Sequence, residues 1–359
     1  MEEIKAHVLT ADLGGTHANV ALFACGGDDR FELVRHKSYA SREITDFPSL
    51  LAEFLRREGS GLKPPAGRAC IDFAGPVDTE RSKACPTNLD WGFTAAEVQE
   101  RTGLAGVTLL NDFEAVGYGM EILAVNRPEA FVRLSSAGDL PPRTGTKLPA
   151  VIIGAGTGLG TSILVQDPRT GRYRPIPGEG GHADFAATEE LEFHVARWIR
   201  DNRNHSRQNP IDCERVVSGP GIANIYQALW ELERGAADSS VFNRVSAADI
   251  FDRPAIIAQN AHGDELCRRT MDFWVRCYAR AAKNCALFPL APGGVFLAGG
   301  IAAKVLPEFQ TGLFMEEFTR CDVPGIRAIL ERTPVFVITD YSIGLYGCAG
   351  VAVNPEQLN

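Results

Sequence analysis

Two glycine-rich turns, each lying between short runs of strand-forming residues, constrain this chain more than any other feature. The first spans residues 12–16 (Asp-Leu-Gly-Gly-Thr) and the second spans residues 154–160 (Gly-Ala-Gly-Thr-Gly-Leu-Gly). The flanking runs are apolar, rich in β-branched residues and too short for helices, so both segments predict strand–turn–strand hairpins. These flanks are residues 7–10, 20–23, 151–153 and 161–165. Glycines at such turns let the backbone approach a ligand and direct N–H groups at an anion.

The context of the turns argues against two common nucleotide-binding motifs. A dinucleotide fingerprint needs G-x-G-x-x-G between a strand and a helix, but residues 154–160 read G-x-G-x-G-x-G and a strand-like run follows. The nearest approach to a Walker A loop, residues 145–148, lacks the spacing and the final hydroxyl. Two phosphate-facing hairpins, one in each of two similar halves of the chain, remain as the interpretation. Ordinary tight turns are the alternative.

Length and composition limit the classes of protein that fit. A chain of 359 residues is long enough for two domains, and a net charge of −9 argues against a protein that binds nucleic acid or an anionic membrane. No apolar run approaches the ~20 residues of a membrane span, and the first six residues do not form a signal-peptide pattern. The nine cysteines include no C-x-x-C pair. This usage favours reduced thiols and a cytoplasmic location over disulfides or a metal site.

The hydrophobic pattern alternates strands with helices, which predicts an α/β protein. Beyond the two hairpins we expect strands at residues 31–39, 69–74, 107–110, 294–298 and 334–339. We expect helices at residues 46–58, 94–102, 114–125, 189–200, 221–234, 247–259, 264–288 and 343–353, and a further helix that begins near Ile301. The segment 126–149 is rich in Pro, Gly and Ser and predicts a loop or linker.

Asn111 and Asp112 form the sharpest single candidate site. They follow a predicted strand at its carboxyl end, where α/β sheets place ligands. A carboxylate there can accept the proton of an attacking hydroxyl, a contribution typically worth about 10²–10⁴-fold in rate. The competing interpretation is that Asp112 only caps the helix that follows.

A second constellation lies in residues 177–182, where glycines allow a tight loop and direct Glu179 and His182 into one space. A carboxylate accepts hydrogen bonds, and an imidazole can donate or accept them. The pair therefore suits sugar hydroxyls, which both donate and accept hydrogen bonds. Surface polar residues are the alternative, and a zinc cluster at His182 is disfavoured because no cysteine follows until Cys213. Glu214 is a further candidate acceptor, with a surface salt bridge as its alternative.

A fourth candidate is the pair Gly299 and Gly300, which follows a predicted strand and precedes the helix expected near Ile301. Glycines there open a slot for a flat base or a ribose, and a helix N-terminus favours nearby negative charge. Close packing of the strand against the helix is the alternative.

Together these segments resemble the bacterial glucokinase family, a branch of the sugar kinases with the actin-like, ribonuclease H-like ATPase fold. The resemblance runs in the family's order from Ala11 to about Gly350. It implies two α/β domains, each with a mixed sheet: a small one of residues 1–122 plus 340–359, and a large one of residues 123–339. The active site would lie in the cleft between them, in a homodimer.

The resemblance also implies roles for the candidate residues. Asp112 would be the base that takes the proton of the sugar 6-hydroxyl, and it would bind the sugar together with Asn111, Glu179, His182 and Glu214. ATP would be bound by Ala11, Asp12, Leu13, Gly14, Gly15, Thr16, Gly156, Thr157, Gly158, Gly299 and Gly300. Asp12 would lie near Mg²⁺ through water, with no metal held tightly by the protein itself. Such an enzyme mainly positions groups while Mg²⁺ offsets phosphate charge.

The chain departs from the family pattern at one position, because His17 stands where many members have Asn after Gly-Gly-Thr. It also lacks the Cys-rich zinc motif of the related repressor and kinase family, and no DNA-binding segment precedes the first strand. The predicted activity is ATP-dependent phosphorylation of glucose to glucose 6-phosphate, the first step of glycolysis. The alternatives are a kinase for another hexose or an amino sugar, a non-catalytic sugar sensor, and an actin-like ATPase without a small substrate.

Overall fold

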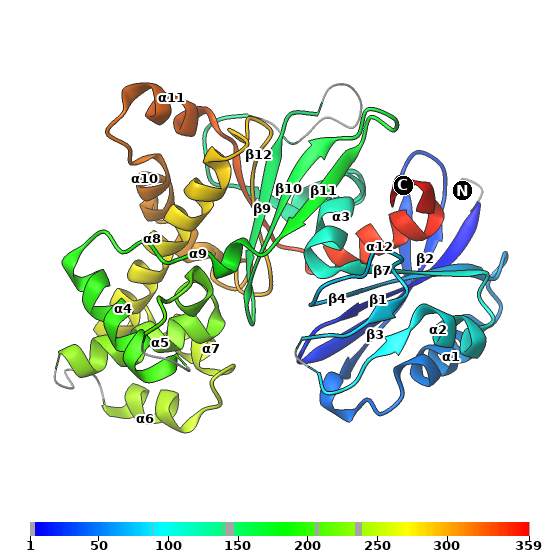
Figure 1. Cartoon of the computed structure of the whole chain (residues 1–359), viewed down its shortest axis with the longest axis horizontal. Helices are drawn as coiled ribbons and strands as arrows, with labels where there is room; N and C mark the ends of the chain where they lie inside the picture. The colour runs from blue at the N-terminus through cyan, green and yellow to red at the C-terminus, as the bar shows by residue number, and fades with distance from the viewer. Residues whose placement is uncertain are drawn as a thin grey trace.

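The computed structural model describes residues 4–87, 89–138, 140, 147–204, 208–233 and 239–358. Within these ranges the chain forms two large sheets, each covered by helices, with two further helices between them, and one small two-stranded sheet (Figure 1). We refer to the two halves as the small and the large domain.

The small domain is built on a mixed sheet with the strand order β3-β2-β1-β4-β7. Strands β1 to β3 are antiparallel neighbours, whereas β4 and β7 run parallel to β1. The strands are β1 (Ala6–Leu13), β2 (His17–Cys25), β3 (Phe31–Ala40), β4 (Ala66–Phe73) and β7 (Gly106–Asn111). Helices α1 (Phe47–Glu58) and α2 (Ala95–Thr102), with the short strands β5 (Lys83–Ala84) and β6 (Phe93–Thr94), complete one apolar core.

The large domain has a second mixed sheet with the order β11-β10-β9-β12-β13-β8. Its strands are β8 (Phe131–Arg133), β9 (Ala150–Ala155), β10 (Leu159–Gln166), β11 (Tyr173–Gly178), β12 (Gly294–Ala298) and β13 (Val335–Ile338). Its helices are α4 (Glu190–Arg203), α5 (Gly219–Leu232), α6 (Ser239–Ala247), α7 (Arg253–Asn260), α8 (Glu265–Leu287), α9 (Leu306–Phe309), α10 (Leu313–Thr319) and α11 (Pro324–Arg332). Short 3₁₀ turns include η3 (Gly180–His182) and η4 (Cys213–Arg215), which return in the description of the site.

Helices α3 (Asp112–Asn126) and α12 (Ile343–Val353) lie between the two sheets (Figure 1). They pack so closely that a Cβ added to Gly347 would lie 1.8 Å from the carbonyl oxygen of Ala115. Helix α12 also contacts β1 and β4, and α3 contacts β10 and β11. One apolar cluster therefore runs from the small sheet through both helices into the large sheet. This pair of helices connects the domains and leaves a cleft at the strand ends.

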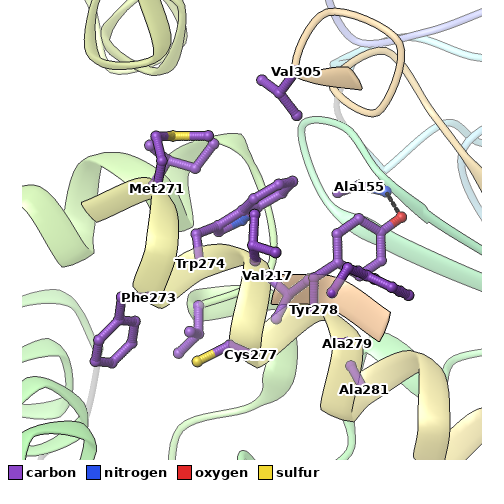
Figure 2. Packing of buried hydrophobic residues seen from close by; sticks show 14 of the residues in the cluster. Ala155, Val217, Met271, Phe273, Trp274, Cys277, Tyr278, Ala279, Ala281 and Val305 are labelled. Carbon is purple, nitrogen blue, oxygen red and sulfur yellow. Dashed lines mark hydrogen bonds between the residues drawn. The ribbon is translucent and has the colours of Figure 1, made fainter. Parts of the chain in front are cut away.

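The core of the large domain fixes the second glycine turn from below. Figure 2 shows Trp274 and Tyr278 side by side on α8, with the Tyr278 hydroxyl directed at Ala155, the last residue of β9. Their ring centroids lie 5.2 Å apart. The fully buried Tyr278 hydroxyl donates to the carbonyl of Ile153 at 3.0 Å and accepts the N–H of Ala155 at 3.3 Å. These bonds hold the last residues of β9, from which the turn at Gly156 begins.

Most of the predicted elements are confirmed. Both glycine turns join antiparallel strands, β1 with β2 and β9 with β10, and a mixed sheet is present in each domain. Thr94 caps α2 with a full capping box, and α12 spans residues 343–353 as predicted. Helix α5 begins two residues earlier than expected because the Ser218 hydroxyl caps it by accepting the N–H of Gly221. Arg234, the last residue of that predicted helix, lies outside the described residues.

Three predictions of secondary structure are wrong. The helix expected at residues 247–259 is present only from Arg253, as α7. An earlier helix, α6, ends at Ala247, and the chain turns between the two where Asp249 accepts the N–H of Phe251. No helix begins at Ile301, where residues 301–305 form turns before the four-residue α9. The loop expected at 126–149 contains β8, which pairs with β13; its residues 139 and 141–146 lie outside the described part.

Candidate active site

A cavity of about 880 Å³ lies between the domains and is lined by residues of all four candidate sites predicted from the sequence. Its walls include glycines of both hairpins, the end of β7, the loop after β11 and the turn after β12. The predicted site residues that line it are Asp12, Gly14, Gly15, Asn111, Asp112, Gly156, Thr157, Gly158, Glu179, His182, Glu214, Gly299 and Gly300. Predicted site residues that are far apart in the sequence therefore line the same cavity.

Asn111 and Asp112 stand at the junction of β7 and α3. The Asn111 side-chain oxygen caps α3 by accepting the N–H groups of Phe113 at 3.0 Å and Glu114 at 3.2 Å. The Asn111 amide donates to the carbonyl of Gly75 at 3.3 Å. Asp112 accepts the N–H of Phe113 at 3.0 Å, while its carboxylate also lines the cleft. Because Asn111 is the N-cap, Asp112 is not needed to begin the helix and stays available for chemistry.

The environment of Asp112 keeps its carboxyl partly protonated at neutral pH. Burial, together with the negative charges of Asp12 and Glu179, raises the pKa of Asp112 to about 7, even though the bond from the Phe113 N–H lowers it. A carboxylate that titrates near the operating pH is suited to general-base work.

Asp72, which sequence analysis did not single out, lies behind Asp12. The two residues are register partners on the parallel strands β1 and β4. Asp72 is 1% exposed, and the Cys348 thiol of α12 donates to its Oδ2 at 3.3 Å. Burial, together with the charges of Asp12 and Asp112, raises the pKa of Asp72 well above its ordinary value. Asp72 is therefore held as a neutral acid beneath the charged floor of the cleft.

The first hairpin presents its backbone to the cavity. The N–H of Gly14 donates to the carbonyl of His17 at 3.0 Å, and the Ser41 hydroxyl donates to the carbonyl of Gly14 at 2.7 Å. Ala11 and Leu13, predicted as ATP-binding residues, bury their side chains in the small-domain core, so only their backbone faces the turn. His17 lines the cavity, whereas Thr16 is exposed and outside its lining.

Close packing and hydrogen bonds from neighbouring segments hold the second hairpin in place. The aromatic ring of Phe113, next to Asp112, covers Gly160 so closely that an added Cβ would lie 1.9 Å from a ring carbon. The N–H of Gly219, at the start of α5, donates to the carbonyl of Gly156 at 2.9 Å. Glu214 accepts the N–H of Leu159 at 2.9 Å. Predicted as a sugar ligand, Glu214 thus uses one carboxylate oxygen to fix the hairpin.

The loop after β11 carries Glu179 and His182. Thr161 anchors it, because its hydroxyl donates to the carbonyl of Gly178 and accepts the N–H of Gly180. Glu179 is exposed to the open cleft. The Nδ1 of His182 lies 3.0 Å from the Oδ2 of Asp212, and this bond raises the pKa of His182 above its ordinary value. Asp212 also caps η4, the turn that carries Glu214, so one carboxylate connects both predicted sugar ligands.

The glucokinase family model matches residues 9–355. The chain belongs to the glucokinase family. The glucokinase of Nostoc punctiforme is 33% identical over 362 aligned residues, which cover 95% of this chain and 97% of that protein. The glucokinase of a Synechocystis species is 32% identical and covers 97% and 98%.

Solved glucokinase structures share the fold. A glucokinase from an Antarctic psychrotroph has a TM-score of 0.74 at 25% identity and covers 97% of this chain and 99% of its own. A Balamuthia mandrillaris glucokinase in complex with glucose has a TM-score of 0.75 at 20% identity, covering 97% and 94%. A ROK-family glucokinase of Streptomyces griseus in complex with glucose and AMPPNP gives 0.64 at 18%, covering 97% and 99%. The predicted actin-like ATPase fold and the predicted enzyme family are confirmed.

Across the described residues no three His, Cys, Asp or Glu side chains form a metal-binding group, and no helix is long and apolar enough to cross a membrane. Gly299 and Gly300 line the cavity without the helix N-terminus that sequence analysis expected behind them. Of residues 301–305, which follow the two glycines, only Lys304 lines the cavity.

Sequence analysis also missed the ion pair that holds the start of α3. Arg81 makes two bonds to the carboxylate of Glu114, at 2.6 and 2.8 Å, and a third to the carbonyl of Leu109. Glu114 is 5% exposed, so this pair is largely removed from water. A Glu at the first position of a predicted helix gives no sign of a partner so far away in the sequence.

Proposed function

We propose that this chain transfers the terminal phosphoryl group of ATP to the 6-hydroxyl of glucose. Family membership supports this reaction, and glucose and AMPPNP occupy solved relatives of the same fold. The observation that carries the proposal is the position of Asp112. It lines the cavity shared by both glycine hairpins and by the loop of Glu179 and His182, with a pKa raised to about 7.

In this mechanism the Asp112 carboxylate accepts the proton of the 6-hydroxyl while the sugar oxygen bonds to the terminal phosphorus and the bond to ADP breaks. Glu179, His182, Glu214 and Asn111 bind the remaining hydroxyls. His182, whose pKa is raised by Asp212, donates to a hydroxyl when protonated. Glu214 and Asn111 already bond to the chain with part of their hydrogen-bonding capacity, so each offers the sugar its remaining atoms.

The phosphates of ATP would lie on the two hairpins. Backbone N–H groups at glycine turns stabilise phosphate oxygens, and this cleft has an excess of acids, so backbone dipoles and a cation are both needed. Mg²⁺ fits the donor set, because Asp12 offers carboxylate oxygens at the cleft and Mg²⁺ is commonly held by one or two carboxylates plus phosphates and water. Asp12 would hold it through water. When bound, the ion neutralises charge on the phosphates.

We further propose that residues 1–122 with 340–359 move against residues 123–339 when sugar binds. The connection through α3 and α12 supports a hinge at this pair. Closure would exclude water, which otherwise competes with the 6-hydroxyl as acceptor. A cytoplasmic location agrees with nine free thiols. The homodimer is expected from the family alone.

A coupled assay with ATP across glucose, mannose, fructose and N-acetylglucosamine tests the proposal. We expect the largest kcat/KM with glucose. A larger value with another hexose or with the amino sugar would identify a different kinase, and saturable glucose binding without turnover would identify a sensor.

A further inference from the structure

The lining of the cleft carries more acidic than basic side chains, because six Asp and Glu residues stand against Lys304 and three histidines, His17, His36 and His182. Six carboxylic acids line it: Asp12, Asp72, Asp112, Glu179, Glu214 and Asp340. Lys304 is the sole Lys or Arg among the described residues of that lining. The phosphates of a nucleotide bring several more negative charges into this space. The ammonium of Lys304 is therefore the one side chain in the described part of this lining that carries a permanent positive charge to attract the phosphates.

The backbone holds Lys304 in a fixed place while its side chain stays exposed. The turn of residues 301–305 closes through a bond from the N–H of Val305 to the carbonyl of Ile301 at 3.0 Å. Val305 is 5% exposed and belongs to the large-domain core (Figure 2). The N–H of Ile301 donates to the carbonyl of Ala155, which ties the turn to the second hairpin. Within the described part of the chain the Lys304 ammonium has no ion pair or hydrogen bond.

The strand order places this turn relative to the sugar loop. The strands run β11-β10-β9-β12, so the loop of Glu179 follows one outer strand of this group and the turn of Lys304 follows the other. The second glycine hairpin, between β9 and β10, lies between them. If the terminal phosphate of the nucleotide lies toward the sugar loop, the phosphates that remain with ADP extend across the hairpin toward the end of β12.

We infer that Lys304 binds a phosphate group that stays with ADP. This assignment rests on the proposed use of a nucleotide in this cleft. A lysine suits the role because its ammonium is a point charge on a flexible stem that carries three donors. The competing interpretation is a solvated surface lysine that contributes nothing to binding.

Calorimetric titration of ADP and adenosine into purified wild type, Lys304→Met, Lys304→Arg and Lys37→Met tests the inference. Lys37 is the matched control because it also faces solvent but lines a separate groove beside α1. We expect Lys304→Met to weaken ADP binding about tenfold, which corresponds to about 1.4 kcal/mol. Adenosine affinity should not change, Lys304→Arg should retain most of the ADP affinity, and Lys37→Met should match wild type.

The salt dependence gives a second readout, because ADP affinity of wild type should fall more steeply with added KCl than that of Lys304→Met. Equal ADP affinity in wild type and Lys304→Met would overturn the inference, as would an equal loss for adenosine and ADP. The test needs no sugar turnover. If wild type phosphorylates glucose and Lys304→Met binds ADP as tightly as wild type, the proposed function stands and only the assignment of Lys304 is wrong. Failure of wild type to bind ADP would overturn both. Melting temperatures check that each variant is folded.

Discussion

The pH dependence of glucose phosphorylation follows directly from the surroundings of Asp112. Burial and the charges of Asp12 and Glu179 raise its pKa to about 7, and the base must be ionised to accept a proton. Activity should therefore rise with pH. A group with this pKa is about one tenth ionised at pH 6, half at pH 7 and nine tenths at pH 8, so kcat/KM for glucose should rise about tenfold from pH 6 to pH 8.

The assay is initial-rate kinetics at limiting glucose and saturating ATP and Mg²⁺, with product measured by a coupling dehydrogenase whose own activity is checked at each pH. Glu179→Gln removes one of the charges that raise the pKa of Asp112, so the midpoint of the rising limb should move to lower pH. Asp212→Asn is the control, because it lowers the pKa of His182 and leaves the rising limb in place. A profile that changes less than twofold between pH 6 and 8 would refute this account of Asp112.

Three further changes test how the structure supports the site. Arg81→Met leaves the buried carboxylate of Glu114 unpaired and should destabilise the fold by about 3 kcal/mol in urea unfolding, with much of the loss recovered when Glu114→Leu is added; an unchanged midpoint would contradict the role of the pair. Tyr278→Phe removes the hydroxyl between Ile153 and Ala155, so we expect a loss of about 1–3 kcal/mol and a raised KM for ATP, and an unaltered KM would show that the second hairpin does not need it. Asp72 has a raised pKa, so the folded state retains a proton that the unfolded chain releases as pH rises, and stability falls with pH. Asp72→Asn should therefore gain about 1 kcal/mol at pH 8 and less at pH 5; equal pH dependence in both proteins would disprove the neutral acid.

The elements that could be predicted from sequence are those with local causes. The glycine turns are set by residues within each hairpin, and Thr94 and Glu97 form their capping box within one turn of α2. Candidate site residues were found wherever polar groups follow a strand or a glycine, as at Asp112 and Glu179. Such positions are recognisable because a strand end and a tight turn both leave a signature in a few adjacent residues.

The rest depends on contacts between distant segments. Asp72 interrupts an apolar strand, but its meaning comes from the register of β1 with β4 and from the thiol of Cys348. Strand β11 was missed because its prolines, Pro175 and Pro177, argue against a strand; they are tolerated at the edge of the sheet, where β11 lies. Lys304 could not be predicted as a site residue, because its neighbours in sequence do not indicate that it lines the cleft. Its position as the one Lys or Arg of the described lining follows only from the fold.

We propose Asp112 as the base for the phosphorylation of glucose by ATP. The most direct measurement is kcat for glucose in wild type and in Asp112→Asn, with the product identified by ³¹P NMR and glucose affinity measured separately by calorimetry. We predict glucose 6-phosphate from wild type and a kcat lower by about 10²–10⁴-fold in Asp112→Asn, with the fold retained because Asn111 still caps α3. A variant with near-normal kcat, or a wild-type product phosphorylated at another position, would contradict it.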